Sequence, residues 1–390
     1  MVNWFEKVLI GWEIETNIRC ESDACESCDI SPCEDCDLCY VCDLLVREHE
    51  EQGYRVERYC SDTACRHGCL LIIHGHRPER IAPQRMAAFC DECRRHGLYD
   101  DFMNHICEEC GYRYREPREV AEKDYEIDMD KFERAYVDGS CGLELPTKPY
   151  PLLQFPYEIY PEWLKVKDEI DVGRKCGCHV NISHPCANNL RHARDVVVTS
   201  LYFSDMLAWL FLTKDTVGRS GSHFRDIKID VYYDFLKGVC TTEKYSFLNI
   251  KLYDDCYVYE YRWVDGAVFF NATYIASVLC SMMVVRPVLQ YRETNYEDFY
   301  AWLKPIAQRY RDMCHSLFFD SEKQVMRNKL FQFIAFYRNE IEAFSRASGI
   351  DLLKVLSELG KKPMHKRGED VNIGVKFVKE KEEVIERCVA

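Results

Sequence analysis

Cysteines spaced two residues apart constrain the fold of this chain more than any other feature. The chain has 23 cysteines in 390 residues, and fourteen of them fall between Cys20 and Cys110. The N-terminal residues, Met1 to Asn17, contain no uninterrupted apolar segment of the kind that opens a secreted protein, so a cytoplasmic location is expected. In that setting, closely spaced cysteines indicate metal binding rather than a disulfide framework. The segment 17–119 is therefore predicted to be an insertion held together by metal ions instead of a hydrophobic core.

Two Cys-x-x-Cys pairs, Cys90 with Cys93 and Cys107 with Cys110, predict a zinc ribbon. Two such pairs present four thiolates tetrahedrally, which is the geometry that Zn²⁺ takes in structural sites. The alternatives are four ordinary buried cysteines and, because thiolates also hold iron, an iron–sulfur cluster. Upstream residues would supply one or two more zinc sites, but their overlapping pairs leave open which of them share an ion. These residues are Cys20, Cys25, Cys28, Cys33, Cys36, Cys39, Cys42, Cys60, Cys65 and Cys69, with His67, His74 and His76.

The overall composition argues for a folded protein and against a large nucleic-acid or lipid interface. Hydrophobic residues make up 47% of the chain, and the formal net charge is −14. A chain this acidic carries no overall electrostatic footprint for nucleic acid or anionic lipid. Residues Arg77–Arg118 are more basic, so nucleic-acid contact there stays open as an alternative. The apolar stretch Ala267–Val285 is nearly long enough to span a membrane, but its polar side chains favour a buried core helix.

Hydrophobic periodicity divides the rest of the chain into short strands followed by helices. Strands are expected at Lys7–Thr16, Glu126–Asp138, Gly142–Leu145, His179–Ile182, Phe247–Leu252 and Tyr257–Trp263. Helices are expected at Asn188–Leu212, Ala267–Val285, Tyr296–Cys314, Glu322–Ala347 and Leu352–Leu359, ahead of a charged tail, Lys361–Ala390. We therefore expect a core domain of residues 1–16 and 120–290, the cysteine-rich insertion 17–119, and a helical C-terminal region, 291–390.

Paired acids mark the first candidate site. Glu13 and Glu15 stand two residues apart on the first expected strand, so both side chains project from the same face. Like charges side by side repel unless a cation neutralises them, and Mg²⁺ prefers such hard oxygen ligands. A solvated strand face is the alternative for this pair. Glu144 follows a tight turn that begins at Asp138, and it enters a later strand.

Two further strands carry polar pairs with the same spacing. His179 and Asn181 share one face of their strand, and Glu260 and Arg262 share one face of another. The alternatives are a core histidine with its hydrogen bonds satisfied and an ordinary ion pair on a strand. The functional interpretation is a metal-binding carboxylate beside a guanidinium that contacts a transferring phosphoryl group.

The order of these pieces resembles the amidoligase family, whose members are related to glutamine synthetase and γ-glutamylcysteine synthetase. Gly-x-Glu-x-Glu near the N-terminus is followed by Asp-x-Ser with Gly-x-Glu-Leu, and then by Gly-x-His-Val-x-Ile. Leu-Asn, ending at Asn249, and Glu-Tyr-Arg, starting at Glu260, close the series. The resemblance covers Val8–Thr16 and then residues 125–285, and members of the family often carry cysteine-rich sequence after the first strand.

The resemblance implies an α+β fold in which a curved antiparallel β-sheet forms a funnel and helices pack outside it. Mg²⁺-bound ATP would enter the funnel, where Arg262 would stabilise the transferring phosphoryl group and Arg219 would lie near the acyl phosphate or the substrate carboxylate. The sequence does not identify the base that takes a proton from the attacking amine, and the acid Asp138 is the candidate for that role. The residues implied in holding the cofactors are Glu13, Glu15, Glu144, His179, Asn181, Glu260 and Asn249.

The implied activity is that of an ATP- and Mg²⁺-dependent carboxylate–amine ligase. Such an enzyme would join a small-molecule or peptide acid to an amine, through an acyl phosphate, and form an amide or isopeptide bond. One departure matters: the family's Gly-x-His-Val-His ends at Asn181 here, so an amide replaces the second imidazole, and His223 is a candidate to compensate. A catalytically degenerate, zinc-containing binding module on the same fold therefore stays open as an alternative, as does a nucleic-acid-associated zinc protein.

Overall fold

The chain divides into two compact units in the computed structural model. One unit consists of Met1–Ile18 together with Ala121–Ala390, and the other is Arg19–Val120. The first unit therefore joins the N-terminal strand to the whole chain after the cysteine-rich segment, C-terminal helices included. The structure describes residues 4–18, 56–59, 70–73, 79–80, 117–137, 142–170, 177–212, 226–239, 241–243, 246–253, 256–262, 269–315, 322–361 and 370–377.

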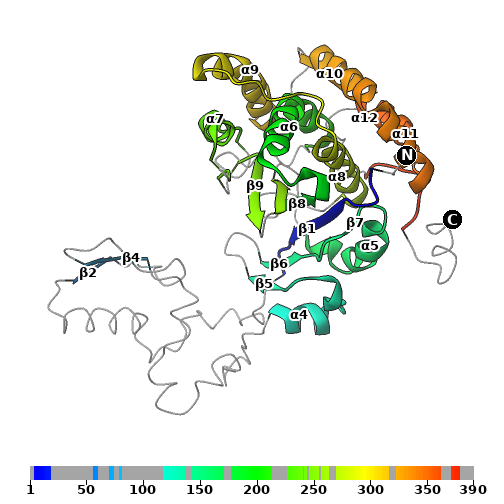
Figure 1. Ribbon diagram of the computed structural model, residues 1–390. Helices are drawn as coiled ribbons and strands as arrows, with labels where there is room; N and C mark the ends of the chain where they lie inside the picture. The colour runs from blue at the N-terminus through cyan, green and yellow to red at the C-terminus, as the bar shows by residue number, and fades with distance from the viewer. Residues whose placement is uncertain are drawn as a thin grey trace, which may run out of the picture. The chain divides into compact units, whose positions relative to one another are not determined.

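An antiparallel sheet forms the centre of the first unit (Figure 1). Its strands are β1 Leu9–Glu15, β5 Tyr136–Val137, β6 Leu143–Pro146, β7 Tyr150–Pro151, β8 Cys178–Ser183, β9 Leu248–Tyr253 and β10 Cys256–Tyr261. The order is β5-β6-β1-β8-β10-β9, and β7 pairs with the start of β1. Strands far apart in the sequence are thus neighbours, and β1 lies between β6 and β8.

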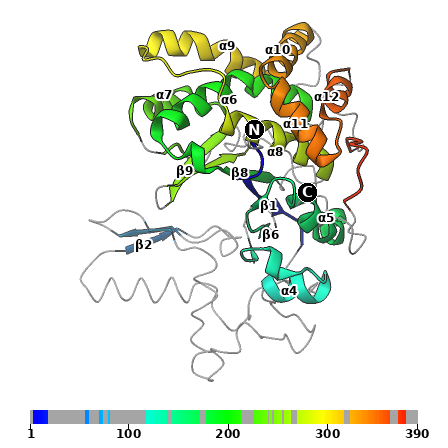
Figure 2. The same ribbon diagram turned by 45° about the vertical axis from the view of Figure 1, so that its right-hand side comes forward.

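Helices accompany this sheet along the chain, which makes the fold α+β. They are α4 Pro117–Asp124, α5 Phe155–Val166, α6 Leu190–Phe211, α7 Ile229–Lys237, α8 Phe270–Val285, α9 Tyr296–His315, α10 Lys323–Phe336, α11 Arg338–Ser348 and α12 Leu352–Lys361. In both views α6 and α8 lie between the sheet and helices α9 to α12 (Figures 1 and 2). Among the described helices, none combines the length and the apolar character needed to cross a bilayer.

The alternation of apolar and polar residues in β1 explains why helices pack against one face of the sheet. Ile10, Trp12 and Ile14 are fully buried. The Trp12 indole N–H donates to the Ser277 hydroxyl of α8 at 3.0 Å, and its ring packs 4.7 Å from that of Phe155 in α5. Because successive side chains of a strand point to opposite faces, the glutamates of β1 face away from this helical layer.

The helices expected from apolar periodicity are confirmed, with one difference. The expected helix Glu322–Ala347 is two helices, α10 and α11, separated at Tyr337. That residue is fully buried, and its hydroxyl donates to the carbonyl of Arg286 at 3.0 Å, so it ties the break to the end of α8. Helices α4, α5 and α7 were not among the expected elements.

Part of the charged tail packs against the core. Asp370 caps the N-terminus of α8, because its carboxylate accepts the backbone N–H groups of Asn271 and Ala272, each at 3.0 Å. Val371 and Phe377, near the two ends of the described segment 370–377, are buried. The tail was expected only to be charged, and its residues 370–377 add buried apolar side chains to the core.

The expected strand Glu126–Asp138 is wrong over most of its length. A short 3₁₀ helix, Met129–Lys131, occupies its centre, and β5 forms only near its end. The cause is local: the Asp128 carboxylate accepts the backbone N–H of Asp130 at 3.1 Å, which turns the chain. The other expected strands are present, with ends that differ by one or a few residues.

A second antiparallel sheet lies in the unit Arg19–Val120. It consists of β2 Val56–Tyr59, β3 Leu70–Ile73 and β4 Glu79–Arg80, in that order. No lasting strand period was expected in this part of the chain, and these strands are indeed two to four residues long.

Gly142 lies where the start of β6 touches the end of the N-terminal segment. Its N–H donates to the carbonyl of Thr16 at 2.6 Å, and a Cβ here would overlap the carbonyl oxygen of Ile18. Gly142→Ala is therefore expected to lower the free energy of unfolding by about 2–3 kcal/mol, because backbone atoms must shift. Urea unfolding measures this loss. Gly11→Ala is the control, since its Cβ would meet its nearest atom at 3.4 Å; an equal loss in both variants contradicts the explanation.

Candidate functional site

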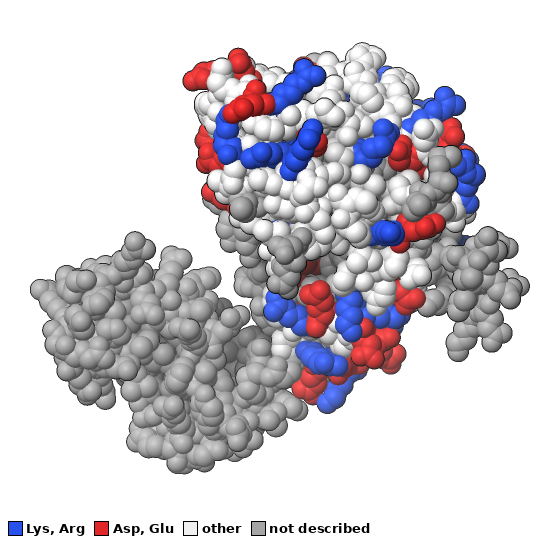
Figure 3. All heavy atoms as spheres, viewed as in Figure 1, with Lys and Arg blue, Asp and Glu red and all other residues white. Residues whose placement is uncertain are grey.

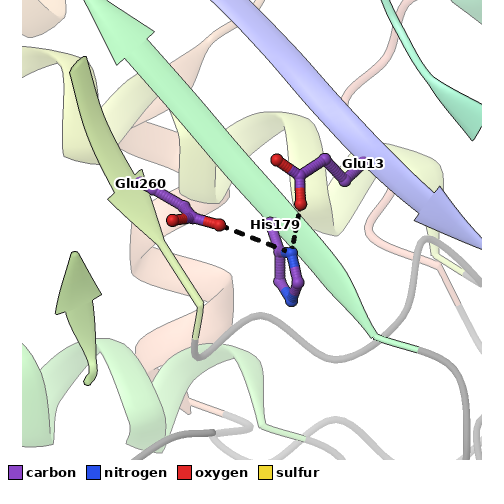
Figure 4. A group of neighbouring side chains, drawn as sticks. All are labelled: Glu13, His179 and Glu260. Carbon is purple, nitrogen blue, oxygen red and sulfur yellow. Dashed lines mark hydrogen bonds and ion pairs between the residues drawn. The ribbon is translucent and has the colours of Figure 1, made fainter. Parts of the chain in front are cut away.

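Cross-strand pairing gathers polar side chains on the sheet face opposite the helices. Glu13 of β1 is paired with His179 of β8. Asn181, two residues further along β8, is paired with Glu260 of β10, which is in turn paired with Asn249 of β9. Residues directly opposite each other in antiparallel strands share a face. Figure 4 shows Glu13, His179 and Glu260 pointing toward one another from three neighbouring strands.

Glu13 is held by donors from two sides. One of its oxygens, Oε2, lies 2.5 Å from His179 Nδ1, and the other, Oε1, accepts the Asn181 amide at 3.0 Å. Burial raises the pKa of Glu13, but the hydrogen bonds from His179 and Asn181, with the charges of His179 and Lys251, outweigh it and lower the pKa to about 2. Glu13 is therefore an ionised carboxylate at neutral pH.

Glu260 is a fully buried carboxylate with compensating donors on both oxygens. The Arg262 guanidinium contacts Oε1 at 2.6 Å. The Asn249 amide donates to Oε2 at 2.5 Å, and the Lys251 ammonium lies 3.0 Å from the same oxygen. A buried charge is stable only when it is paired and hydrogen-bonded, which this arrangement provides. Burial lowers the pKa of Lys251, but the charges of Glu260 and Glu13 outweigh burial and raise the pKa above its ordinary value, so Lys251 is protonated.

Two more glutamates extend the site toward β6. Glu15 Oε1 lies 3.7 Å from His179 Nε2, and the other carboxylate oxygen of Glu15 accepts the backbone N–H of Gly177. Glu144 is paired with Glu15 across the sheet, and Tyr136 of β5 hydrogen-bonds the Glu144 carboxylate. Burial raises the pKa of Glu144; the tyrosine bond lowers it, neighbouring negative charges raise it again, and the result is about 7.

The raised pKa of Glu144 predicts that this carboxyl destabilises the fold as the pH rises. Its pKa is about 7 in the folded chain against an ordinary value of 4.5, so the folded state binds the proton more tightly and stability is lost across that interval. At 1.36 kcal/mol per pKa unit, the loss is about 3 kcal/mol. Without added divalent cation, Glu144→Gln should remove most of this loss when unfolding free energies at about pH 5 and about pH 8 are compared. An unchanged pH dependence contradicts the assignment.

The centre of this face has donors that fit a divalent cation. Glu13, His179 and Glu260 each offer one ligand atom, and the three atoms lie within 4.8 Å of one another. Carboxylate oxygens suit Mg²⁺ and Mn²⁺, and an imidazole nitrogen completes ligand sets of transition metals. The donor chemistry therefore fits an ion held between β1, β8 and β10.

The structure brings together the residues expected from five separate stretches of sequence. Asp138 and Arg219 lie outside the described residues, as do His223 and every cysteine proposed above as a zinc ligand. The expected residues that share the polar face or its rim are Glu13, Glu15, Glu144, His179, Asn181, Asn249, Glu260 and Arg262.

Sequence reasoning missed two members of the site, Lys251 and Tyr136. Lys251 follows Asn249 by two residues on β9, so the same alternation that paired the other residues could have placed it on this face. Tyr136 lies in β5, which pairs it with Glu144. The sequence does not indicate that pairing, because β5 is only two residues long.

This arrangement can hold a cation and present the positive charges of Lys251 and Arg262 beside it. It also keeps Glu144, whose pKa is about 7, partly protonated at neutral pH. Figure 3 shows Lys and Arg interspersed with Asp and Glu over the described surface of that view, without a single basic field there. The expectation against nucleic acid stays a prediction. Comparison with models of known protein families and with curated proteins found no match.

Proposed function

We propose that this chain is an ATP-dependent carboxylate–amine ligase of the amidoligase type. One observation carries the proposal: residues from motifs far apart in the sequence meet on one polar face of an antiparallel sheet. Glu13, His179 and Glu260 come from β1, β8 and β10, and their ligand atoms lie within 4.8 Å of one another. A shared face is what the resemblance to glutamine synthetase and γ-glutamylcysteine synthetase requires of these motifs.

The fold proposed for this activity is the curved sheet of that family, open as a funnel on its polar side. An antiparallel sheet with one face under helices and the other lined by acids supports it. The segment 17–119 is proposed to be a zinc-stapled insertion, on the strength of its Cys-x-x-Cys pairs. The location is proposed to be cytoplasmic.

Mg²⁺ would be held by Glu13, His179 and Glu260, with Glu15 and Glu144 beside it. Bound there, the ion would offset negative charge on the ATP phosphates. The chain's own contribution is fixed charge. Glu13 is anionic across the physiological range, and the guanidinium of Arg262, fixed by Glu260 at 2.6 Å, is positioned to stabilise a transferring phosphoryl group.

The proposed reaction has two steps. An oxygen of the substrate carboxylate attacks the γ-phosphorus of ATP, the bond to the bridging oxygen breaks, and ADP leaves. The amine nitrogen then attacks the acyl carbon, the bond from that carbon to the phosphate oxygen breaks, and inorganic phosphate leaves. The nitrogen must lose a proton, and Asp138 is the acid proposed to accept it. Arg219 is proposed to hold the substrate carboxylate.

An ADP-release assay tests this function. Protein with Mg²⁺ and ATP is incubated with pooled amino acids and pooled amines, beside the variant Glu13→Gln/Glu15→Gln. Release that needs both pools and is lost in this variant is the expected result. Glu297→Gln/Glu358→Gln, two exposed acids with the same change of charge, is the matched control and should retain activity. No release from any pool contradicts the ligase.

A second candidate is a binding module without turnover. It is favoured by the protein donors that already contact the carboxylates of Glu13 and Glu260. Both oxygens of Glu13 and both of Glu260 already accept protein donors, and Asn181 stands where the family has a histidine. Such a module would bind ATP and a cation without releasing ADP. ATP binding measured by calorimetry, combined with no release in the assay above, is the outcome that favours it.

A further inference from the structure

Lys251 contacts the same two carboxylates that line the candidate cation seat, but at their other oxygens. On one side, His179 Nδ1 lies 2.5 Å from Oε2 of Glu13 and 3.6 Å from Oε1 of Glu260. On the other side, Lys251 Nζ lies 3.0 Å from Oε2 of Glu260 and 3.8 Å from Oε1 of Glu13. Each carboxylate therefore reaches to two places, the seat beside His179 and the lysine ammonium.

In two-metal sites the ions lie about 3.5–4 Å apart, so a carboxylate between them can contact both, one through each oxygen. One of the two positive centres here is the ammonium of a side chain on β9. Glu260 has no exposure to solvent, and a buried carboxylate needs charged or hydrogen-bonding partners. Lys251 supplies a positive charge from a fixed point of the sheet, where its backbone is paired with Val258 of β10.

We propose that the Lys251 ammonium takes the place of a second divalent cation beside Glu13 and Glu260, so that this face holds one divalent ion. The inference rests on the cation seat of the proposed function. A tethered ammonium cannot diffuse away, and its like charge repels a second ion from that position. The neighbouring Arg262 contacts Oε1 of Glu260, which leaves the Oε2 side to Lys251 and the Asn249 amide.

Counting bound Mn²⁺ tests the proposal without any activity measurement. The full-length protein is titrated with Mn²⁺ by calorimetry, and the bound ions are observed by electron paramagnetic resonance. Wild type is expected to bind one ion at this face, and Lys251→Met is expected to bind two whose spectra show magnetic coupling. Lys251→Arg keeps the positive charge and should bind one. Ions bound elsewhere are identified as those that remain in Glu13→Gln.

Loss of the Lys251–Glu260 ion pair could also unfold the chain, so the design includes a second variant. Lys251→Gln keeps a hydrogen-bond donor for Glu260 without the charge, and circular dichroism checks its fold. Two ions in Lys251→Gln support the proposal equally. If Lys251→Met regains its fold only when Mn²⁺ is added, the ion has replaced the ammonium, which also supports it.

The outcomes separate this inference from the proposed function. Two ions in wild type, or one ion with unchanged affinity in every variant, overturn the role of Lys251 and leave the cation seat in place. No ion in wild type or any variant removes the seat, and the inference falls with it. One ion in Lys251→Met and none in wild type overturns the inference as well, because the wild-type face would then hold no divalent ion.

Discussion

Glu13→Gln is expected to weaken Mn²⁺ binding at the polar face by about 100-fold or more. The substitution keeps the size of the side chain and removes the negative charge of a carboxylate whose pKa is about 2. A neutral amide is a poor ligand, and its NH₂ group places a donor where Glu13 accepts from His179 or Asn181. Calorimetric titration of the protein with Mn²⁺ measures the change.

The control for this variant is Glu297→Gln, an exposed acid on α9. Its Mn²⁺ affinity should equal that of wild type, which excludes a general effect of net charge. Thermal unfolding of Glu13→Gln shows whether the fold is kept, since a carboxylate with a lowered pKa contributes stability above its ordinary pKa that the amide lacks. A folded Glu13→Gln protein with wild-type affinity contradicts the cation seat.

Asp205→Ala is expected to cause the largest loss of stability, about 3–5 kcal/mol in the free energy of unfolding. Asp205 of α6 is fully buried. Its Oδ1 lies 2.6 Å from the Lys329 ammonium of α10, and its Oδ2 accepts from Arg309 Nε of α9 at 2.8 Å. Burial lowers the pKa of Lys329 and the charge of Asp205 raises it, with burial the stronger. Without the aspartate, two cations remain at this helix junction with no anion.

Guanidinium unfolding of Asp205→Ala, Lys329→Met and the double variant measures this coupling. The double variant should lose less stability than the sum of the two single variants, because it removes the buried ammonium together with its partner. Asp205→Asn keeps the hydrogen-bonding shape and should fall between wild type and alanine. A loss below about 1 kcal/mol for Asp205→Ala would show that the helix layer does not depend on this network.

The sequence was informative wherever one face of an element is apolar. The alternation of Ile10, Trp12 and Ile14 placed β1 correctly and also fixed which face carries Glu13 and Glu15. Apolar residues at helical spacing located α6. A nearly continuous apolar stretch located α8, in which every residue except Asn271 and Val285 is buried.

Prediction failed where local polar contacts decided the backbone. Ile127 and Met129 are buried two residues apart, as on one face of a strand, but the Asp128 side chain between them turns the chain. Similarly, a single buried tyrosine, Tyr337, separates two helices whose periods run on without a break.

The candidate site was predictable as a set of residues but not as a set of contacts. Glu13 and Glu15 are equivalent in the sequence pattern, yet Glu13 contacts His179 Nδ1 and Asn181 while Glu15 accepts a backbone N–H from Gly177. That difference depends on the register between β1 and β8. The contact of Lys251 with Glu260 depends in the same way on the pairing of β9 with β10, which joins residues across the sheet rather than along the chain.

Transfer of oxygen from substrate to phosphate is the most direct test of the proposed ligase. Pooled acids carrying ¹⁸O in their carboxylates are incubated with amines, ATP, Mg²⁺ and the wild-type protein, and the released phosphate is analysed by mass spectrometry. An acyl phosphate leaves one carboxylate oxygen on phosphorus, so the account predicts phosphate that contains one ¹⁸O atom. Release of ADP with unlabelled phosphate would mean that water attacks ATP, and would contradict the account.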